Sequence, residues 1–172
     1  MTNFDPNTKD FSRVNISSID AEKTYGQQRL LSIQGNISDS EQDGSSLSVR
    51  SDMKIPILGS PQVWYLIRMT DVNFIMFNAF SRKLAGTRGR QTSKGTVVEQ
   101  YLGLFTPGDF FQEWRFKLLA EEGPVFAIES AKSPNMLVGC DGRHCDWEDH
   151  WLSLWTDETS STHHQKWRFE EV

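Results

Sequence analysis

Cysteine is scarce in this chain, and long apolar runs are missing. The 172 residues include only two cysteines, Cys140 and Cys145, too few for the disulfide framework that small secreted domains use. No apolar run approaches the roughly 18 residues of a membrane-spanning helix, and the polar N-terminus has no apolar segment of the secretory kind. We therefore expect a soluble protein, cytoplasmic or released without a signal peptide, whose core is held together by packing.

A basic surface and the common catalytic signatures are also missing. Lys and Arg total 18 against 23 Asp and Glu, which gives a net charge of -5 and a pI of about 5.4. Proteins that bind nucleic acid usually carry a basic run or face, so we expect neither nucleic acid nor membrane insertion. The sequence has no Gly-x-Ser-x-Gly, no phosphate-binding loop and no His-Glu-x-x-His. We therefore expect no enzyme and no cofactor.

Three copies of one pattern, each about 50 residues long, dominate the sequence. Each copy ends in Gln-x-Trp, and the tryptophans Trp64, Trp114 and Trp167 are 50 and 53 positions apart. An apolar residue follows two places after each tryptophan: Leu66, Phe116 and Phe169. Short segments of strand-forming residues lie between these landmarks, separated by turn clusters. Four short strands per copy, about twelve in all, predict a closed all-β domain.

Two further landmarks repeat in register. The segments Leu84-Ala-Gly86 and Leu137-Val-Gly139 are equivalent, because the glycine of each lies 26 positions before the glutamine of its Gln-x-Trp. Leu102-Gly-Leu104-Phe105 and Leu152-Ser-Leu154-Trp155 lie 50 positions apart. The period-two alternation in the last two segments predicts that their leucines face the core and that the aromatic residue ending each segment faces outward.

Three copies ending in Gln-x-Trp resemble the ricin-B-type lectin family. The resemblance runs from about Gln27 to Val172 and implies a β-trefoil with pseudo-threefold symmetry over residues 25–172. The repeats implied cover about residues 25–69, 70–120 and 121–172. Residues 1–24 fall outside the resemblance, and we expect a flexible N-terminal arm or an added strand there. The resemblance also implies that the three Gln-x-Trp tryptophans are core residues.

The resemblance also locates the sugar site of the family. These lectins use an Asp early in the repeat, an aromatic residue after the third strand and a polar residue just before Gln-x-Trp. The Asp position falls near Ala85 and Val138, so the hydrogen-bonding carboxylate is missing in both copies. The aromatic position falls at Phe105 and Trp155. The position before the glutamine holds Pro61, Phe111 and His164. The resemblance therefore implies a lectin that departs from the ordinary galactose site.

The third copy holds the richest set of aromatic and polar residues. Strand alternation predicts that three of its residues face outward: Trp151, Ser153 and Trp155. Side chains that donate or accept hydrogen bonds are expected around them: Asp141, Arg143, Asp146 and His164. Because a sugar needs an apolar platform and such polar groups, we predict a shallow, non-catalytic carbohydrate site centred on Trp155. In the alternative interpretation, Trp147 and Trp151 only cover the open end of the barrel.

Glycans or glycoconjugates are the partners that this prediction implies, with assembly into a homo-oligomer left open. The alternative is a protein-binding trefoil, such as a cytosolic protease inhibitor, whose loops 38–46 and 87–95 reach into a protease cleft. A targeting subunit of a toxin complex is a third interpretation. Neither alternative changes the expected fold.

The two cysteines lie close to two histidines, His144 and His150, within eleven residues. Cys-x4-Cys inside a hairpin is not the spacing of a zinc finger. We therefore predict that Cys140 and Cys145 form a disulfide across the loop or remain ordinary thiols, and hold no structural metal. After dialysis the protein should contain no stoichiometric zinc, and a chelator should leave its unfolding temperature unchanged. One zinc per chain, with unfolding on chelation, would contradict this prediction.

Overall fold

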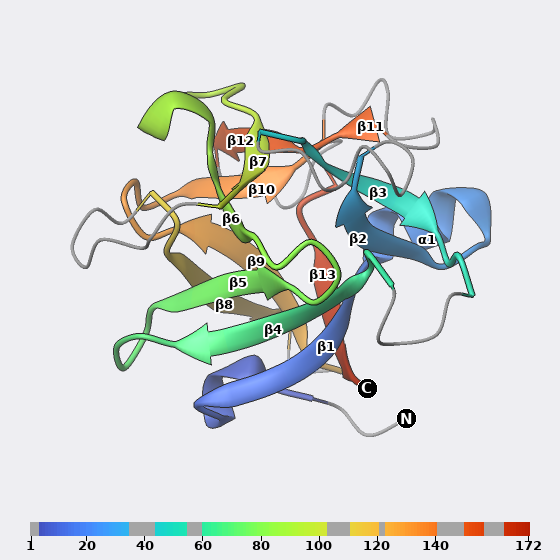
Figure 1. Cartoon of the computed structure of the whole chain (residues 1–172). Coiled ribbons are helices and arrows are strands. Elements are labelled where there is room, and N and C mark those ends of the chain that lie inside the picture. Colours follow the sequence, from blue (N-terminus) through green and yellow to red (C-terminus); the bar gives the residue numbers. More distant parts are fainter. Residues whose placement is uncertain are drawn as a thin grey trace.

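Six antiparallel strands form a barrel, and three β-hairpins cover one of its ends (Figure 1). The computed structural model describes residues 4–34, 44–54, 60–102, 111–120, 123–140, 150–156 and 164–172. Among these residues, no helix is both long and apolar enough to cross a membrane. The barrel and its three hairpins make the predicted β-trefoil, with the core inside the barrel and beneath the hairpins.

The strands follow the three copies in order. The first copy holds β1 (Phe11–Ser18), β2 (Arg29–Ile33), β3 (Leu47–Ser51) and β4 (Val63–Arg68). The second holds β5 (Phe74–Asn78), β6 (Leu84–Thr87), β7 (Val98–Tyr101) and β8 (Trp114–Ala120). The third holds β9 (Val125–Ser130), β10 (Met136–Gly139), β11 (His150–Trp151), β12 (Ser153–Thr156) and β13 (Trp167–Glu171). Only Leu152 separates β11 from β12, so the described strands fill the twelve expected places.

Helical structure in the described residues is confined to short segments. Helix α1 (Ile19–Tyr25) lies between β1 and β2, and two 3₁₀ turns cover Pro6–Thr8 and Arg88–Arg90. The Ser18 side chain accepts from the backbone N–H of Ala21 at 3.3 Å and so caps the start of α1. Gly26 ends the helix at a φ of 66°, in the left-handed region that glycine adopts at little cost. This insertion lengthens the first copy.

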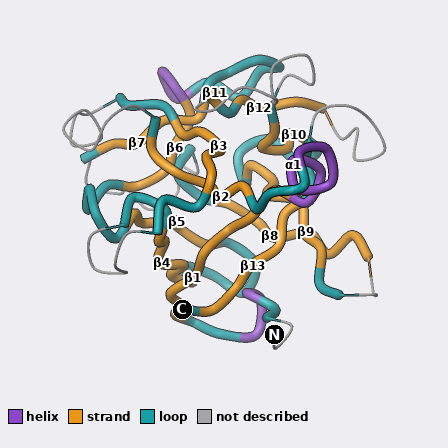
Figure 2. Tube along the Cα trace, turned by 90° about the vertical axis from the view of Figure 1, so that its right-hand side faces the viewer, coloured by secondary structure: helices purple, strands orange, loops and turns teal. Residues whose placement is uncertain are grey.

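Strand β1 closes the barrel by pairing on both of its edges. It is antiparallel to β4 on one side and to β13 on the other (Figures 1 and 2). Its residues Val14 and Ile16 are fully buried. Of the two expectations for this segment, the structure shows the strand and not the flexible arm for residues 11–18, and the strand takes the first place in the first repeat. The first repeat accordingly begins near Phe11, ahead of the predicted boundary at residue 25.

Three buried tryptophans join the barrel to the hairpins. Trp64, Trp114 and Trp167 have no exposed surface. Each donates its indole N–H to a backbone carbonyl in the second strand of its own copy: Leu31 at 3.0 Å, Ala85 at 3.2 Å and Val138 at 3.1 Å. The predicted core role of these residues is confirmed, and the repeated bond shows the pseudo-threefold symmetry directly.

The apolar residue two places after each tryptophan also lies in the core. Phe116 packs between two other rings, with centroid distances of 4.9 Å to both Phe74 and Phe169. Aromatic pairs at this separation add to the stability gained from buried area alone.

Trp114→Ala should lower the free energy of unfolding by about 3–5 kcal/mol, because it removes a fully buried ring. Trp114→Phe should cost less, since it keeps most of the apolar volume and loses the indole hydrogen bond. Urea denaturation followed by circular dichroism measures both. The control is Trp151→Ala, which removes an exposed ring and should change stability by about 0.5 kcal/mol or less. Equal losses for Trp114→Ala and the control would contradict the core role.

Candidate functional site

The indole bonds show which hairpin positions are equivalent in the three copies. Since each indole contacts the same backbone position, the residues just before that position are equivalent as well: Leu30, Leu84 and Leu137. Across the hairpins these leucines pair with residues of the third strand: Arg50, Tyr101 and Trp155. An aromatic ring therefore occupies one equivalent place in the second and third copies, and an arginine occupies it in the first.

The predicted match of Phe105 with Trp155 is wrong. Strand β7 ends at Tyr101, four residues earlier, and Leu102, expected in the core, is 71% exposed. Phe105 itself lies outside the described residues. The Leu102-Gly-Leu104 segment has the alternation of a strand, but the pairing of β6 with β7 sets the register. That register selects Val98-Glu99-Gln100-Tyr101, which has no period-two alternation of apolar and polar residues and so gave no such signal in the sequence.

The second-copy site consists of Glu99 and Tyr101 on β7 with Arg88 and Phe111 beside them. Glu99 is only 5% exposed, and its two carboxylate oxygens have separate partners. The Tyr101 hydroxyl donates to one oxygen at 2.7 Å, and the Arg88 guanidinium pairs with the other. The resemblance implied a carboxylate on the second strand, which has none, whereas Glu99 comes from the third strand.

The hydrogen bond between Tyr101 and Glu99 also affects protonation. Burial, then the hydrogen bond to Glu99 and the negative charge of that carboxylate, raise the pKa of the Tyr101 hydroxyl well above its usual value. The hydroxyl therefore stays protonated at physiological pH and keeps donating to Glu99. Two charge-assisted contacts hold this carboxylate in one orientation.

Gly86 leaves the space that the Tyr101 ring occupies. A Cβ atom at Gly86 would lie 2.9 Å from the Gln112 Cγ and 3.2 Å from the Tyr101 Cδ2. The Phe111 ring meets the Tyr101 ring edge-on at a centroid distance of 6.2 Å. The Arg90 guanidinium lies 5.0 Å from the centre of the Phe111 ring. The site is therefore a small aromatic platform beside a fixed carboxylate.

The third-copy site consists of Trp155, Lys94 and His164. Trp155 on β12 is half-buried, and the Lys94 ammonium lies 5.5 Å from the centre of its ring. The Gln165 side-chain amide donates to the Thr156 carbonyl at 3.0 Å, which holds the neighbouring His164 near the end of β12. Of the residues predicted for this site, the structure thus brings Trp155 and His164 into one region.

Other predicted members of the third-copy site lie elsewhere. Trp151 is 47% exposed, but β11 pairs with β3 of the first copy and Trp151 stacks on His150 at 4.7 Å. The two tryptophans therefore do not form one platform. Ser153, predicted to face outward, is only 4% exposed because the neighbouring segment at Val97 bridges to it and covers it. Asp141, Arg143 and Asp146 lie outside the described residues.

Cys140 is buried and disulfide-bonded, whereas Cys145 lies outside the described residues. This finding favours the disulfide over the two ordinary thiols left open by the sequence. Within the parts of the chain that the structure describes, no three His, Cys, Asp or Glu side chains gather as metal ligands would.

Comparisons with known proteins establish the fold. No protein-family model and no curated protein matches the sequence. ThreeFoil, a designed threefold-symmetric protein, is 18% identical, with 93% of this chain covering 99% of that chain at a TM-score of 0.73. A ricin B-like lectin of Macrolepiota procera, solved with lactose, is 16% identical. The match covers 93% of this chain and 95% of the lectin, at a TM-score of 0.69.

An enzyme contains a similar domain. An exo-β-1,3-galactanase of Clostridium thermocellum is 17% identical at a TM-score of 0.73. The match covers 94% of this chain but 30% of the galactanase. At such identities the three likenesses show a shared β-trefoil fold.

Tyr101→Phe should change how stability depends on pH. A tyrosine whose folded pKa is raised contributes stability that is fully present below the unfolded pKa, about 10. That contribution is lost as the pH rises through the folded value. The unfolding temperature of the parent should therefore fall more steeply above about pH 10 than that of Tyr101→Phe. Thermal unfolding followed by circular dichroism measures both slopes, and parallel curves would contradict the raised pKa.

Proposed function

We propose that this protein binds carbohydrate without catalysis, through shallow sites on the hairpins of its second and third copies. The observation that carries the proposal is the half-exposed aromatic ring at the same hairpin position in both copies, Tyr101 and Trp155. A pyranose ring has an apolar face that packs on such a platform, while its hydroxyl groups need hydrogen-bonding partners at the rim.

The second-copy site provides both parts of this arrangement. Glu99 is almost completely buried, but it orients Arg88, whose side chain is 58% exposed and can donate to sugar hydroxyls at the rim of the Tyr101 ring. Because Glu99 already fixes it, Arg88 needs little reordering when a ligand arrives. In the third copy the Lys94 ammonium lies over the Trp155 ring, and His164 precedes Gln165, whose amide contacts the backbone at the end of β12.

The absence of catalysis is part of the proposal. Glycoside hydrolysis generally uses two carboxyl groups that flank the scissile bond. Among the described residues that form the two sites, Glu99 alone is acidic. The Macrolepiota procera protein, a lectin solved with lactose, supports sugar binding on this fold. The galactanase weighs less, because this chain corresponds to 30% of its length.

Binding to a glycan array, with matched variants, tests the proposal. Removing one platform by Tyr101→Ala or Trp155→Ala should weaken binding about tenfold, equivalent to about 1.4 kcal/mol. The double variant should lose binding at the concentrations used. Trp151→Ala is the matched control, since it removes an exposed aromatic ring outside both sites.

Thermal unfolding of each variant separates lost binding from lost folding. A parent protein that binds no glycan on the array would overturn the proposed function. So would a folded double variant that binds like the parent. Inhibition of a protease by a protein that gives a blank array would support the protein-binding alternative.

A further inference from the structure

The loop between β6 and β7 concentrates positive charge in an otherwise acidic protein. Residues 88–97 contain Arg88, Arg90 and Lys94 and no Asp or Glu, whereas the whole chain has a net charge of -5. Lys132 adds a cation from the third copy, since its ammonium donates to the Arg90 carbonyl at 3.4 Å. The basic charge therefore gathers on the loop that lies between the two aromatic platforms.

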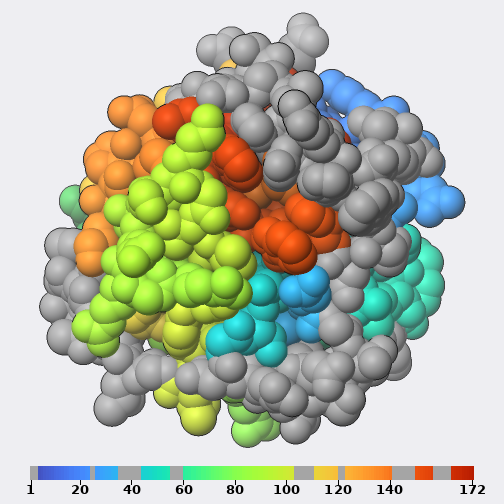
Figure 3. All heavy atoms as spheres, turned by 90° about the horizontal axis from the view of Figure 1, so that it is seen from above, coloured from blue at the N-terminus to red at the C-terminus, as the bar shows by residue number. Residues whose placement is uncertain are grey.

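The main chain fixes this loop against the third-copy site. The Gly95 N–H donates to the Leu154 carbonyl at 2.7 Å, and the Leu154 N–H donates to the Thr96 carbonyl at 2.9 Å. Seen from above, the yellow-green surface of residues around 88–98 lies directly beside the red surface of β12 (Figure 3). Lys94 is thereby held next to Trp155, although its side chain remains long and exposed.

Lys94 differs from the neighbouring Arg88 in its electrostatic partners. The Arg88 guanidinium pairs with the buried Glu99 carboxylate, which balances its charge. No carboxylate of the described residues pairs with the Lys94 ammonium, whose recorded contact is the face of Trp155. Such an exposed cation–π contact is weak, so a sugar that stacks on Trp155 can displace the ammonium to the rim of the ring.

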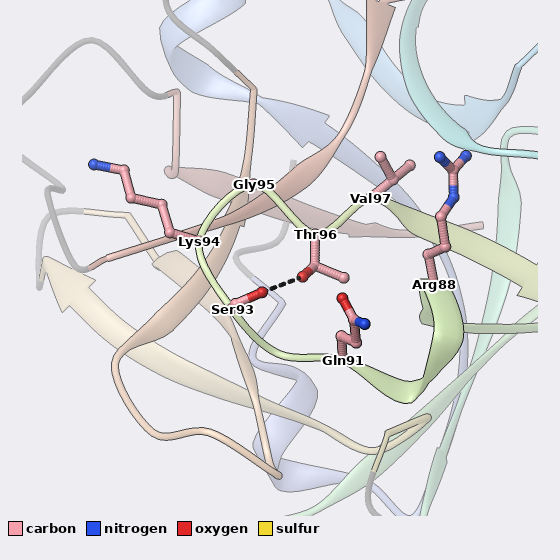
Figure 4. Close-up of a pocket in the computed structure, with 7 residues that line it drawn as sticks. All are labelled: Arg88, Gln91, Ser93, Lys94, Gly95, Thr96 and Val97. Carbon is pink, nitrogen blue, oxygen red and sulfur yellow. Dashed lines mark hydrogen bonds between the residues drawn. The ribbon is translucent and has the colours of Figure 1, made fainter.

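An open polar hollow of about 280 Å³ lies on the same loop as Lys94. Its lining includes Arg88, Gln91, Ser93, Lys94 and Thr96. Figure 4 shows Gln91, Ser93 and Thr96 turned into the bend of the loop, while Lys94 extends away from it. The Ser93 and Thr96 hydroxyl groups are 3.1 Å apart. These groups offer hydrogen bonds to a substituent that reaches past the stacked sugar.

We propose that the third-copy site prefers glycans that carry an acidic group, a carboxylate or a sulfate, which pairs with Lys94 beside the sugar stacked on Trp155. This inference rests on the proposed function, because it names the class of glycan that the site takes. An ammonium with three donors and no carboxylate partner among the described residues gains a charge-assisted hydrogen bond from such a group. A neutral glycan offers it no equivalent contact.

The experiment uses matched glycan triplets, in which one neutral core is also present in sialylated and in sulfated form. The core that the array selects is then titrated by calorimetry in all three forms. We expect the parent protein to bind at least one acidic form about tenfold more tightly than the neutral core at low salt. The preference should shrink at about 1 M salt, where the Debye length falls to about 3 Å. Whichever form binds more tightly than the neutral core shows whether the site takes a carboxylate or a sulfate.

Lys94→Met tests the residue itself, because methionine keeps the unbranched stem and removes the charge. We expect this variant to lose the preference for the acidic form, so that it binds the acidic and neutral forms of the core with equal affinity, whatever that affinity is relative to the parent. The matched control is Lys23→Met. Lys23 is an exposed lysine on α1, which lies on the opposite side of the molecule from β6 and β7 in Figures 1 and 2. It should keep the full preference.

Each outcome separates the two proposals. Equal binding of neutral and acidic forms overturns the acid preference and leaves the proposed function in place. A preference that survives in Lys94→Met also overturns it, since the acid is then held elsewhere. If no form of any core binds, the proposed function fails and the acid preference fails with it.

Discussion

The hydrogen bond from a buried indole to a hairpin carbonyl is the contact on which the rest of this structure depends. It occurs once in each copy and joins the last strand of the copy to its second strand. The last strand belongs to the barrel and the second to a hairpin, so the bond sets the position of the hairpin over the barrel. A slip of one residue would turn every hairpin side chain to the opposite face. Tyr101 and Trp155 stay at the surface because this register is fixed.

The core could be predicted from the sequence because large apolar residues at constant spacing have few alternatives. Three tryptophans at a constant spacing, each followed two places later by an apolar residue, indicate three equivalent parts of one core. The first strand was harder to recognise, although Val14 and Ile16 alternate with polar residues. Because helix α1 lengthens the first copy, this strand begins more than 50 residues before its Gln-x-Trp and falls outside the repeat period.

The candidate site was harder to predict because it depends on which residues face each other across a hairpin. Leu102-Gly-Leu104-Phe105 and Leu152-Ser-Leu154-Trp155 look alike in one dimension, but only backbone pairing shows that Tyr101 is the equivalent of Trp155. Glu99 was missed for the same reason. Its role becomes visible when Arg88 and Tyr101 are seen to hold its two oxygens. A buried carboxylate without such partners would be strongly unfavourable.

The closure of the barrel by β1 has a consequence for synthesis. Val14 pairs with Glu171, so the first strand of this domain to be synthesised needs the last one as its neighbour. At about 5–20 residues per second, β1 waits roughly 10–30 s for that partner. During this interval one edge of β1 has no partner, and such an edge can pair with another nascent chain. The unpaired edge of β1 is therefore a site for aggregation during synthesis, until the finished barrel places every barrel strand between two neighbours.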